Sequence, residues 1–143
     1  MKDLSAVIVI NRPVEEVFAY AIDLNNDANW RKSVDKSAMR LGQAAEVGGV
    51  GYSRVGDQEA EWKIIVYEPE NYTVTWEFVN GPILGQGGYR SSAVEGGTEF
   101  TLYANIEPAG ALRYLKPLFN WVGGRQNQGD VEKLKQILEG SPG

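Results

Sequence analysis

Residues 7–30 read VIVINRPVEEVFAYAIDLNNDANW, and they narrow the fold more than any other part of the 143-residue chain. Residues 4–10 carry apolar side chains on both alternating sets, which predicts a strand covered on both faces. Pro13 then occupies a place suited to the first position of a helix. The stretch therefore predicts a strand, a turn at proline, an amphipathic helix and a polar segment that closes at Trp30.

The helix predicted after Pro13 is short and has one apolar face. Glu15 and Glu16 lie in its first turn, where the helix dipole favours negative charge. Asp23 is a candidate cap for a second brief helix or turn that runs through Asn29. The apolar residues recur at spacings of three and four and form one stripe, made of Val14, Val17, Phe18, Ala21 and Ile22.

Composition excludes several kinds of chemistry. The chain has 14 basic and 19 acidic residues, a net charge of -5, and no clustered basic stripe, so a nucleic-acid partner is not expected. It has no Cys and no His, which excludes disulfides, thiolate nucleophiles and Ser-His-Asp triads. Any catalysis would use carboxylates, Lys, Tyr or bound water. No metal-ligand cluster stands out, and we expect no cofactor.

The length and the N-terminal residues predict one cytoplasmic domain over residues 1–143. Neither a signal peptide nor a transmembrane helix is visible in the sequence, so membrane insertion is not expected. The sequence leaves the oligomeric state open between a monomer and a dimer.

From about residue 34 to residue 107 the pattern changes to strands. Between turns, apolar residues alternate with polar ones, as in strands that bury one face and expose the other. Such a sheet needs a long cover, which roughly the last 30 residues are predicted to supply as a helix with a kink or a start at Pro117. The turn signals are spaced as in an antiparallel meander, at Gly48-Gly49, Gly56-Asp57, Glu68-Pro69, Gly81-Pro82 and Gly96-Gly97.

Residues 123–130, GGRQNQGD, separate two apolar stretches of this C-terminal segment. Glycines in a helix interior cost about 1 kcal/mol each relative to alanine. Continuing the apolar stripe of the preceding turns places Gln126 on the inward face, with Asn127 or Arg125 there if the helix phase differs. One interpretation is a helix that roofs a cavity with an amide pointing in. The other is an exposed loop between two shorter helices.

The order of these elements resembles the START-like, helix-grip (SRPBCC) superfamily and, within it, the polyketide cyclase/dehydrase and lipid-transport family. The resemblance implies an α+β fold in which a curved antiparallel sheet of six to seven strands wraps around a long C-terminal helix. Two short helices follow the first strand, and an elongated cavity lies between sheet and helix. The motifs that carry it are residues 12–18, Asp23 through Trp30, Tyr67-Glu68-Pro69, Gly96-Gly97-Thr98, Leu134-Lys135 and Leu138-Glu139.

The resemblance implies that this cavity binds a lipid, a polyketide or another apolar or aromatic molecule. The leading hypothesis is therefore non-enzymatic binding or carriage of a small hydrophobic or aromatic ligand. The first alternative is an aromatase/cyclase-type enzyme that works without His or metal. The second is a protein-interaction module like the chaperone-activating relatives, which would need a sizeable exposed apolar patch. The family has no universal catalytic motif that could be transferred to this chain, so the catalytic residues stay unassigned.

Candidate ligand contacts lie on the inferred inner faces of the strands and the last helix. Trp30 could form part of the cavity mouth or plug the open end of the sheet. The face of Tyr52 is ambiguous because the glycines around it allow a bulge. Glu77 and Arg90 are expected on the outside, although a register slip of one residue would bring Arg90 in. The remaining candidates are Trp62, Trp76, Phe78, Tyr89, Ser91, Phe100, Leu102, Phe119, Val122 and Gln126.

Tyr89 and the glycine-rich residues 81–88 each allow more than one interpretation. Tyr89 could anchor a ligand or bond to the backbone, because a buried tyrosine hydroxyl needs a partner. The glycine-rich residues 81–88 lack the Lys-Ser/Thr ending and the strand-to-helix context of a phosphate loop. They predict a hairpin instead, which could gate the entrance of the cavity.

Overall fold

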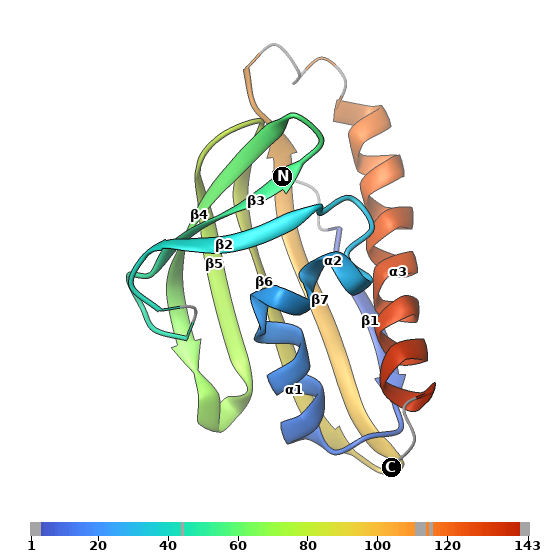
Figure 1. Cartoon of the computed structure of the whole chain (residues 1–143). Coiled ribbons are helices and arrows are strands. Elements are labelled where there is room, and N and C mark those ends of the chain that lie inside the picture. Colours follow the sequence, from blue (N-terminus) through green and yellow to red (C-terminus); the bar gives the residue numbers. More distant parts are fainter. Residues whose placement is uncertain (1–3, 44, 111–113, 115, 141–143) are drawn as a thin grey trace.

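The computed structural model describes residues 4–43, 45–110, 114 and 116–140, and for residues 116–122 the backbone alone. Seven strands form one antiparallel sheet in the order β1-β7-β6-β5-β4-β3-β2 (Figure 1). The elements are β1 (Ala6–Ile10), α1 (Val14–Ile22), η1 (Leu24–Asn26), α2 (Asp27–Trp30), β2 (Lys36–Leu41), β3 (Val50–Val55), β4 (Gln58–Glu68), η2 (Pro69–Asn71), β5 (Thr73–Asn80), β6 (Ile83–Val94), β7 (Gly97–Pro108) and α3 (Lys116–Gly140).

The sheet curves around α3, which confirms the predicted helix-grip arrangement. Figure 1 shows α3 beside β1 and β7, with α1 and α2 in front of the central strands. The contacts agree, since α3 packs on β1 and β7, α1 packs on β6, and α2 lies between β2 and α3. None of the helices in the described ranges is long and apolar enough to cross a membrane.

The first strand is an edge strand, so the expectation that both its faces are covered is wrong. Ala6 and Ile10 are buried against the core, but Val7 and Val9 are 50% and 46% exposed. The strand pairs with β7 alone, and α3 packs against it. An apolar run on both faces does not distinguish a central strand from an edge strand whose outer face meets solvent.

The two short helices follow the predicted pattern closely. The stripe of α1 is buried as predicted, at Val14, Val17, Phe18 and Ala21. The helix begins at Val14, one residue later than expected, because the carbonyl of Pro13 accepts the amides of Glu16 and Val17 at 3.1 Å each. Asp23 caps η1, since its Oδ1 accepts the amide of Asn25 at 3.0 Å.

The C-terminal helix is continuous from Lys116 to Gly140, so the loop interpretation of residues 123–130 is wrong. Pro117 is its second residue and marks a start, where the missing amide proton has no partner to lose. Two polar residues anchor the glycine-rich middle. Asn127 Nδ2 donates to the carbonyl of Leu4 at 2.9 Å, and the carboxylate of Asp130 pairs with Arg31, which directly follows α2. These contacts offset the low helix propensity of the glycines.

The hairpin at residues 81–88 turns at Gly81-Pro82, and the rest of the glycine-rich segment belongs to β6. Gly81 has a φ of +120°, a conformation that other residues rarely adopt. The predicted hairpin is therefore confirmed. Its function as a gate stays a prediction.

Two helix glycines give a matched test of this packing. A Cβ at Gly124 would meet nothing within 4 Å, whereas one at Gly123 would lie 3.0 Å from Leu4 Cδ1. We expect Gly124→Ala to raise the free energy of unfolding by about 1 kcal/mol, the propensity gain for a helix interior. Gly123→Ala should gain clearly less, because Leu4 must move. Urea unfolding of both variants measures the difference, and an equal gain would contradict the packing described.

Candidate functional site

A cavity of about 520 Å³ lies between the inner face of the sheet and the helices. Its wall is mostly apolar, and its volume lies within the range of pockets that hold small organic molecules. Residues of β4, β5, β6 and β7 line one side, and residues of α1, η1, α2 and α3 line the other. The aromatic side chains on the wall include Trp62, Trp76, Phe78 and Tyr89.

Each tryptophan of the wall stands opposite a glycine on the neighbouring strand. Trp62 pairs with Gly51, and Trp76 pairs with Gly87. A Cβ at Gly51 would lie 2.5 Å from the Trp62 ring, and one at Gly87 would lie 3.0 Å from Trp76 Nε1. The glycines thus give the indoles room against the sheet. The ring centroids of the two tryptophans are 6.3 Å apart, and Trp76 meets Tyr89 edge-on at 4.9 Å.

A polar cluster made of Asp27, Arg31, Tyr89 and Asp130 joins the α2 segment, β6 and α3. Arg31 Nη1 donates to the hydroxyl of Tyr89 at 3.2 Å, and Arg31 Nε donates to Asp130 Oδ2 at 3.1 Å. The amide of Lys32 donates to Asp130 Oδ1 at 3.0 Å. Asp27, Arg31 and Tyr89 line the cavity, so the cluster supplies a polar patch on an otherwise apolar wall.

The carboxylate of Asp27 is the least compensated member of this cluster. Its side chain is buried, and Oδ1 has no hydrogen-bond partner among the described residues. Burial raises its pKa from 3.8 to about 6, and a hydrogen bond with Ser37 and the charge of Arg31 only partly oppose that shift. A carboxyl group with a pKa near 6 can both accept and release a proton close to neutral pH.

A chain of hydroxyl groups links Asp27 to the aromatic wall. Trp62 Nε1 donates to Ser53 Oγ at 3.1 Å, and Ser53 Oγ lies 2.8 Å from Ser37 Oγ. An ionised carboxylate can only accept, so Ser37 donates its proton to Asp27 and Ser53 in turn donates its proton to Ser37. The orientation of this tryptophan and the environment of this carboxylate are therefore coupled.

Burial also raises the pKa of the Tyr89 hydroxyl and of the Asp130 carboxyl. The phenol of Tyr89 is therefore protonated at neutral pH. Asp130 has its charge balanced by Arg31 at 3.1 Å. Within the described ranges, no group of three or more carboxylates is arranged to hold a metal ion.

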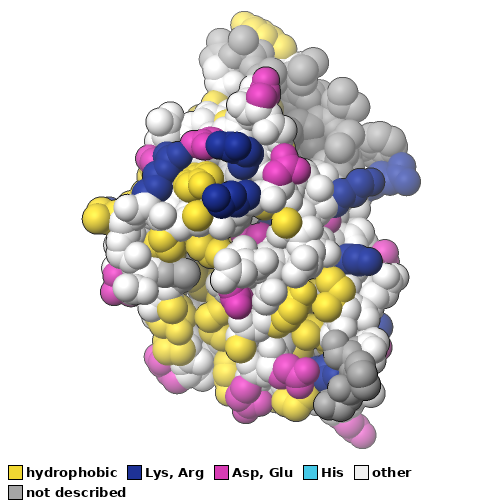
Figure 2. Space-filling model, viewed as in Figure 1, with side chains coloured by type: hydrophobic (Ala, Val, Ile, Leu, Met, Phe, Trp, Pro, Cys, Tyr) yellow, Lys and Arg dark blue, Asp and Glu magenta, His cyan; other side chains and the backbone are white. Residues whose placement is uncertain are grey.

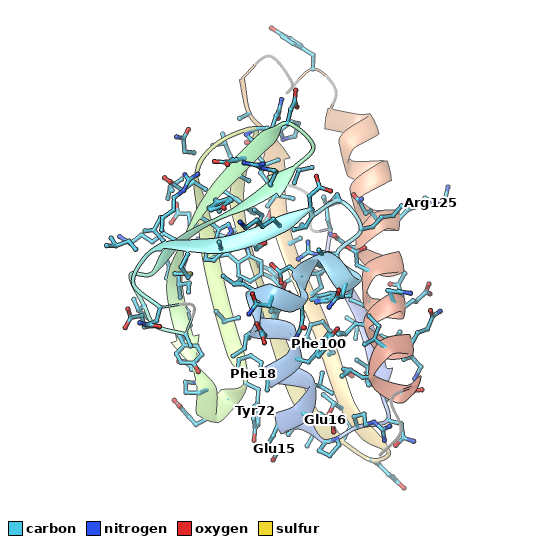
Figure 3. The ribbon with its side chains drawn as sticks, viewed as in Figure 1. Glu15, Glu16, Phe18, Tyr72, Phe100 and Arg125 are labelled. Atoms are coloured by element: carbon cyan, nitrogen blue, oxygen red, sulfur yellow. The ribbon has the colours of Figure 1, made fainter. Side chains whose placement is uncertain are left out.

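Half of the residues that the sequence predicted as ligand contacts line the cavity. Those that line it are Trp62, Trp76, Phe78, Tyr89, Leu102, Gln126 and Asn127. Asn127 is buried and bonded to the carbonyl of Leu4, whereas Arg125 points away from the sheet (Figure 3). The side chains of Phe119 and Val122 lie outside the described residues.

Three other candidates are buried beside the cavity and do not line it. The Trp30 ring is 1% exposed and packs against Tyr89 and Phe100, with centroid distances of 5.5 Å and 5.9 Å. Phe100 is fully buried, and Ser91 is buried directly opposite it in the register of β6 and β7. Trp30 therefore belongs to the core behind Tyr89, because α2 presses it onto the sheet.

Tyr52 lies on the outer face of the sheet. Its neighbours Gly51 and Ser53 point toward the cavity wall, and strand alternation turns Tyr52 outward. There its ring lies 4.5 Å below the guanidinium of Arg40. Figure 2 shows basic side chains gathered over this part of the sheet, where Arg40 and Arg54 pair with Glu59.

Glu77 and Arg90 are exposed on the outer face, as predicted. Arg90 lies over the ring of Tyr103, with 4.9 Å between its Cζ and the ring centroid. The register that pairs Arg90 with Thr101 keeps its neighbours Tyr89 and Ser91 inward. The one-residue slip considered from the sequence does not occur.

Sequence reasoning missed Asp27, Arg31 and Asp130. The four-residue spacing of Asp27 and Arg31 was a usable signal, since residues i and i+4 share one face of a helix. Asp130 gave no such signal, because its partner lies 99 residues away in the chain.

Replacing Asp27 by Asn tests the environment of this carboxyl. Because its folded pKa lies above its unfolded value, the folded protein binds more protons between about pH 4 and pH 6, and stability falls as pH rises through that window. Asn does not titrate, so the stability of Asp27→Asn does not fall in this pH window. Asp27→Asn should therefore gain up to about 3 kcal/mol in unfolding free energy at pH 7.5, and close to nothing at pH 4.

Urea unfolding at both pH values measures the effect, with Asp57→Asn in the exposed β3–β4 turn as the control for loss of one charge. The other titratable groups around Asp27, namely Asp23, Arg31, Tyr89 and Asp130, are unchanged in both proteins. A gain of the same size at pH 4 and at pH 7.5 would contradict the raised pKa.

Comparison with solved structures gives neighbours over nearly the whole chain. The protein TTHA0849 from Thermus thermophilus is 17% identical, with a TM-score of 0.78, covering 99% of this chain and 100% of that one. The Zhui aromatase/cyclase from Streptomyces sp. R1128 is 15% identical, with a TM-score of 0.78, and the match covers 96% of this chain and 93% of that one. The major latex-like protein 151 from Panax ginseng is 13% identical, with a TM-score of 0.71, and the match covers 95% of this chain and 96% of that one.

These identities are low, so the likeness to solved structures shows the fold alone. No curated protein matches the chain in sequence. The family described as polyketide cyclase / dehydrase and lipid transport matches residues 1–139. The match spans both the sheet and the C-terminal helix that enclose the cavity, and the chain therefore belongs to the polyketide cyclase / dehydrase and lipid transport family.

Proposed function

We propose that the protein binds and carries a small, mostly apolar or aromatic molecule in the cavity between the sheet and α3. The observation that carries this proposal is the cavity of about 520 Å³ with its wall of tryptophan, phenylalanine and aliphatic side chains. Family membership and the structural neighbours support ligand binding or cyclase activity in general, without distinguishing the two.

Affinity would come from the apolar wall and orientation from a few polar groups. Burying apolar ligand surface contributes about 25 cal/mol per Å². The polar groups on the wall are few, as in most small-molecule sites, and they include Arg31, Tyr89 and Gln126. A ligand with one polar end and an aromatic or aliphatic body matches this distribution.

Filling the cavity from its wall tests the proposal. Ala104 of β7 lines the cavity, whereas Ala93 of β6 is exposed. Ala104→Phe should weaken binding of an apolar fluorescent probe by about tenfold or more, because the new ring occupies ligand space. Stability should be kept, since a phenyl ring fills space that is empty without ligand.

The matched control is Ala93→Phe, which makes the same change on the surface and should leave probe binding unchanged. Native mass spectrometry of the purified protein adds a test that needs no chosen probe. A small molecule that co-purifies with the wild type and is lost from Ala104→Phe would support the proposal. Equal probe binding by both variants would contradict it.

An enzyme of the cyclase type is the second candidate, and the unpartnered Oδ1 of Asp27 favours it. Cyclisation of a polyketide-like substrate requires removal of a proton from a carbon beside a carbonyl group. In this proposal Asp27 would accept such a proton, and Arg31 and Tyr89, which line the same cavity, would stabilise the enolate oxygen.

Proton exchange on a model ketone tests this second candidate. In deuterated buffer at neutral pH, the protein should accelerate deuterium exchange at the methyl group of 2-acetylnaphthalene, measured by NMR. Asp27→Asn should lower that acceleration about 100-fold or more, in line with the usual contribution of a general base. An exchange rate no faster with the wild type than in buffer would exclude Asp27 as a base for this ketone.

A further inference from the structure

We propose that Asp27 selects ligands that carry a hydrogen-bond donor, such as a phenolic hydroxyl, attached to an aromatic body. This inference rests on the proposed binding function and adds which chemical group of the ligand the cavity recognises. It also excludes a class that the presence of Arg31 would otherwise suggest, namely ligands that end in a carboxylate.

Asp27 Oδ1 is a buried acceptor without a hydrogen-bond partner among the described residues. The residue is 6% exposed and lines the cavity, and this oxygen has no hydrogen-bond partner in the described part of the chain. A buried acceptor without a partner is costly, and the cost is larger for a charged group. A donor brought by a ligand would remove it, so ligand binding and satisfaction of Asp27 are linked.

The polar cluster has more negative than positive charge to offer an incoming ligand. Arg31 is paired with Asp130 at 3.1 Å and donates to Tyr89 at 3.2 Å, so its charge is already balanced. Asp27 is a second carboxylate that acts on Arg31, while Lys32 also acts on Asp130 and Asp23 also acts on Asp27. With these three carboxylates ionised against two cations, the charges around Arg31 sum to an excess negative charge. An anionic ligand would be repelled at this end of the cavity, whereas a neutral donor would not.

Hydrogen bonds through two serines connect Asp27 to the aromatic wall. Asp27 is linked through Ser37 and Ser53 to Trp62 Nε1, in contacts of 2.8 Å and 3.1 Å for the two that involve Ser53. Trp62 in turn lies beside Trp76 on the wall. The carboxylate is therefore joined to the aromatic wall by hydrogen bonds in series, and both line the same cavity, which suits a hydroxyl carried on an aromatic body.

Three naphthalene derivatives of similar size test the proposal by calorimetry at neutral pH. The compound 2-naphthol has a donor, 2-methoxynaphthalene has an acceptor alone, and 2-naphthoate is an anion. Hydrogen bonds to charged groups contribute enough to change affinity by about tenfold or more. We expect 2-naphthol to bind about tenfold more tightly than the methyl ether, and 2-naphthoate to bind most weakly.

Two variants assign the preference to Asp27. In Asp27→Leu the ratio of the affinities for 2-naphthol and its methyl ether should fall to about one, because no acceptor is left. In Asp27→Asn the ratio should fall and 2-naphthoate should bind more tightly than it does to the wild type, because the negative charge is gone. The matched control is Asp57→Asn, which removes a carboxylate in the exposed β3–β4 turn and should leave both the ratio and the order of the three affinities unchanged.

The outcomes separate this inference from the function on which it rests. If none of the three compounds binds the wild type, the proposed binding function fails. If all bind with equal affinity, or if 2-naphthoate binds most tightly, the cavity binds aromatic molecules but Asp27 does not select a donor. If Asp27→Leu does not fold, Asp27→Asn decides, and an unchanged ratio in it overturns the inference.

Discussion

The buried ion pair between Arg31 and Asp130 is the interaction on which the rest of the structure depends. It joins the end of α2 to the middle of α3 at the point where α3 is richest in glycine. A buried pair of this kind contributes little net stability, but leaving one partner alone is strongly destabilising. Its effect is therefore on position: it holds α2 against α3, and α2 in turn holds Trp30 and Asp27 against the sheet.

The position of the cavity depends on where large side chains fill the space between α3 and the sheet and where glycines leave it empty. One end of the inner layer is filled by Val131, Leu134 and Leu138 of α3, which are buried. Further along, Gly123 of α3 lies on the cavity wall, and glycines of β3 and β6 lie opposite Trp62 and Trp76. The cavity stays open because these strand glycines let the indole rings of Trp62 and Trp76 lie against the sheet. In a helix-grip protein the function depends on this lining, and the fold alone does not decide it.

Much of the fold could be predicted from the chain because its signals are local. The stripe of α1, the cap at Asp23 and the turn at Gly81 each depend on neighbouring residues, and each appears where it was expected. The inner faces of the strands also followed from alternation. An error came where burial depends on distant partners: β1 became an edge strand with Val7 and Val9 exposed.

By itself the sequence determined the order of the elements, the inward faces of β4, β5 and β7 and the absence of Cys and His chemistry, because residue identity and local spacing decide these. The tertiary structure alone decided that residues 123–130 continue the helix and that Asp27, Arg31 and Asp130 meet at the cavity. Glycine propensity opposed that helix, and contacts from Leu4 and Arg31, each about 100 residues or more away, outweighed it. Long-range pairing of this kind leaves no periodic pattern in the chain, so it becomes visible only when the two segments are brought together.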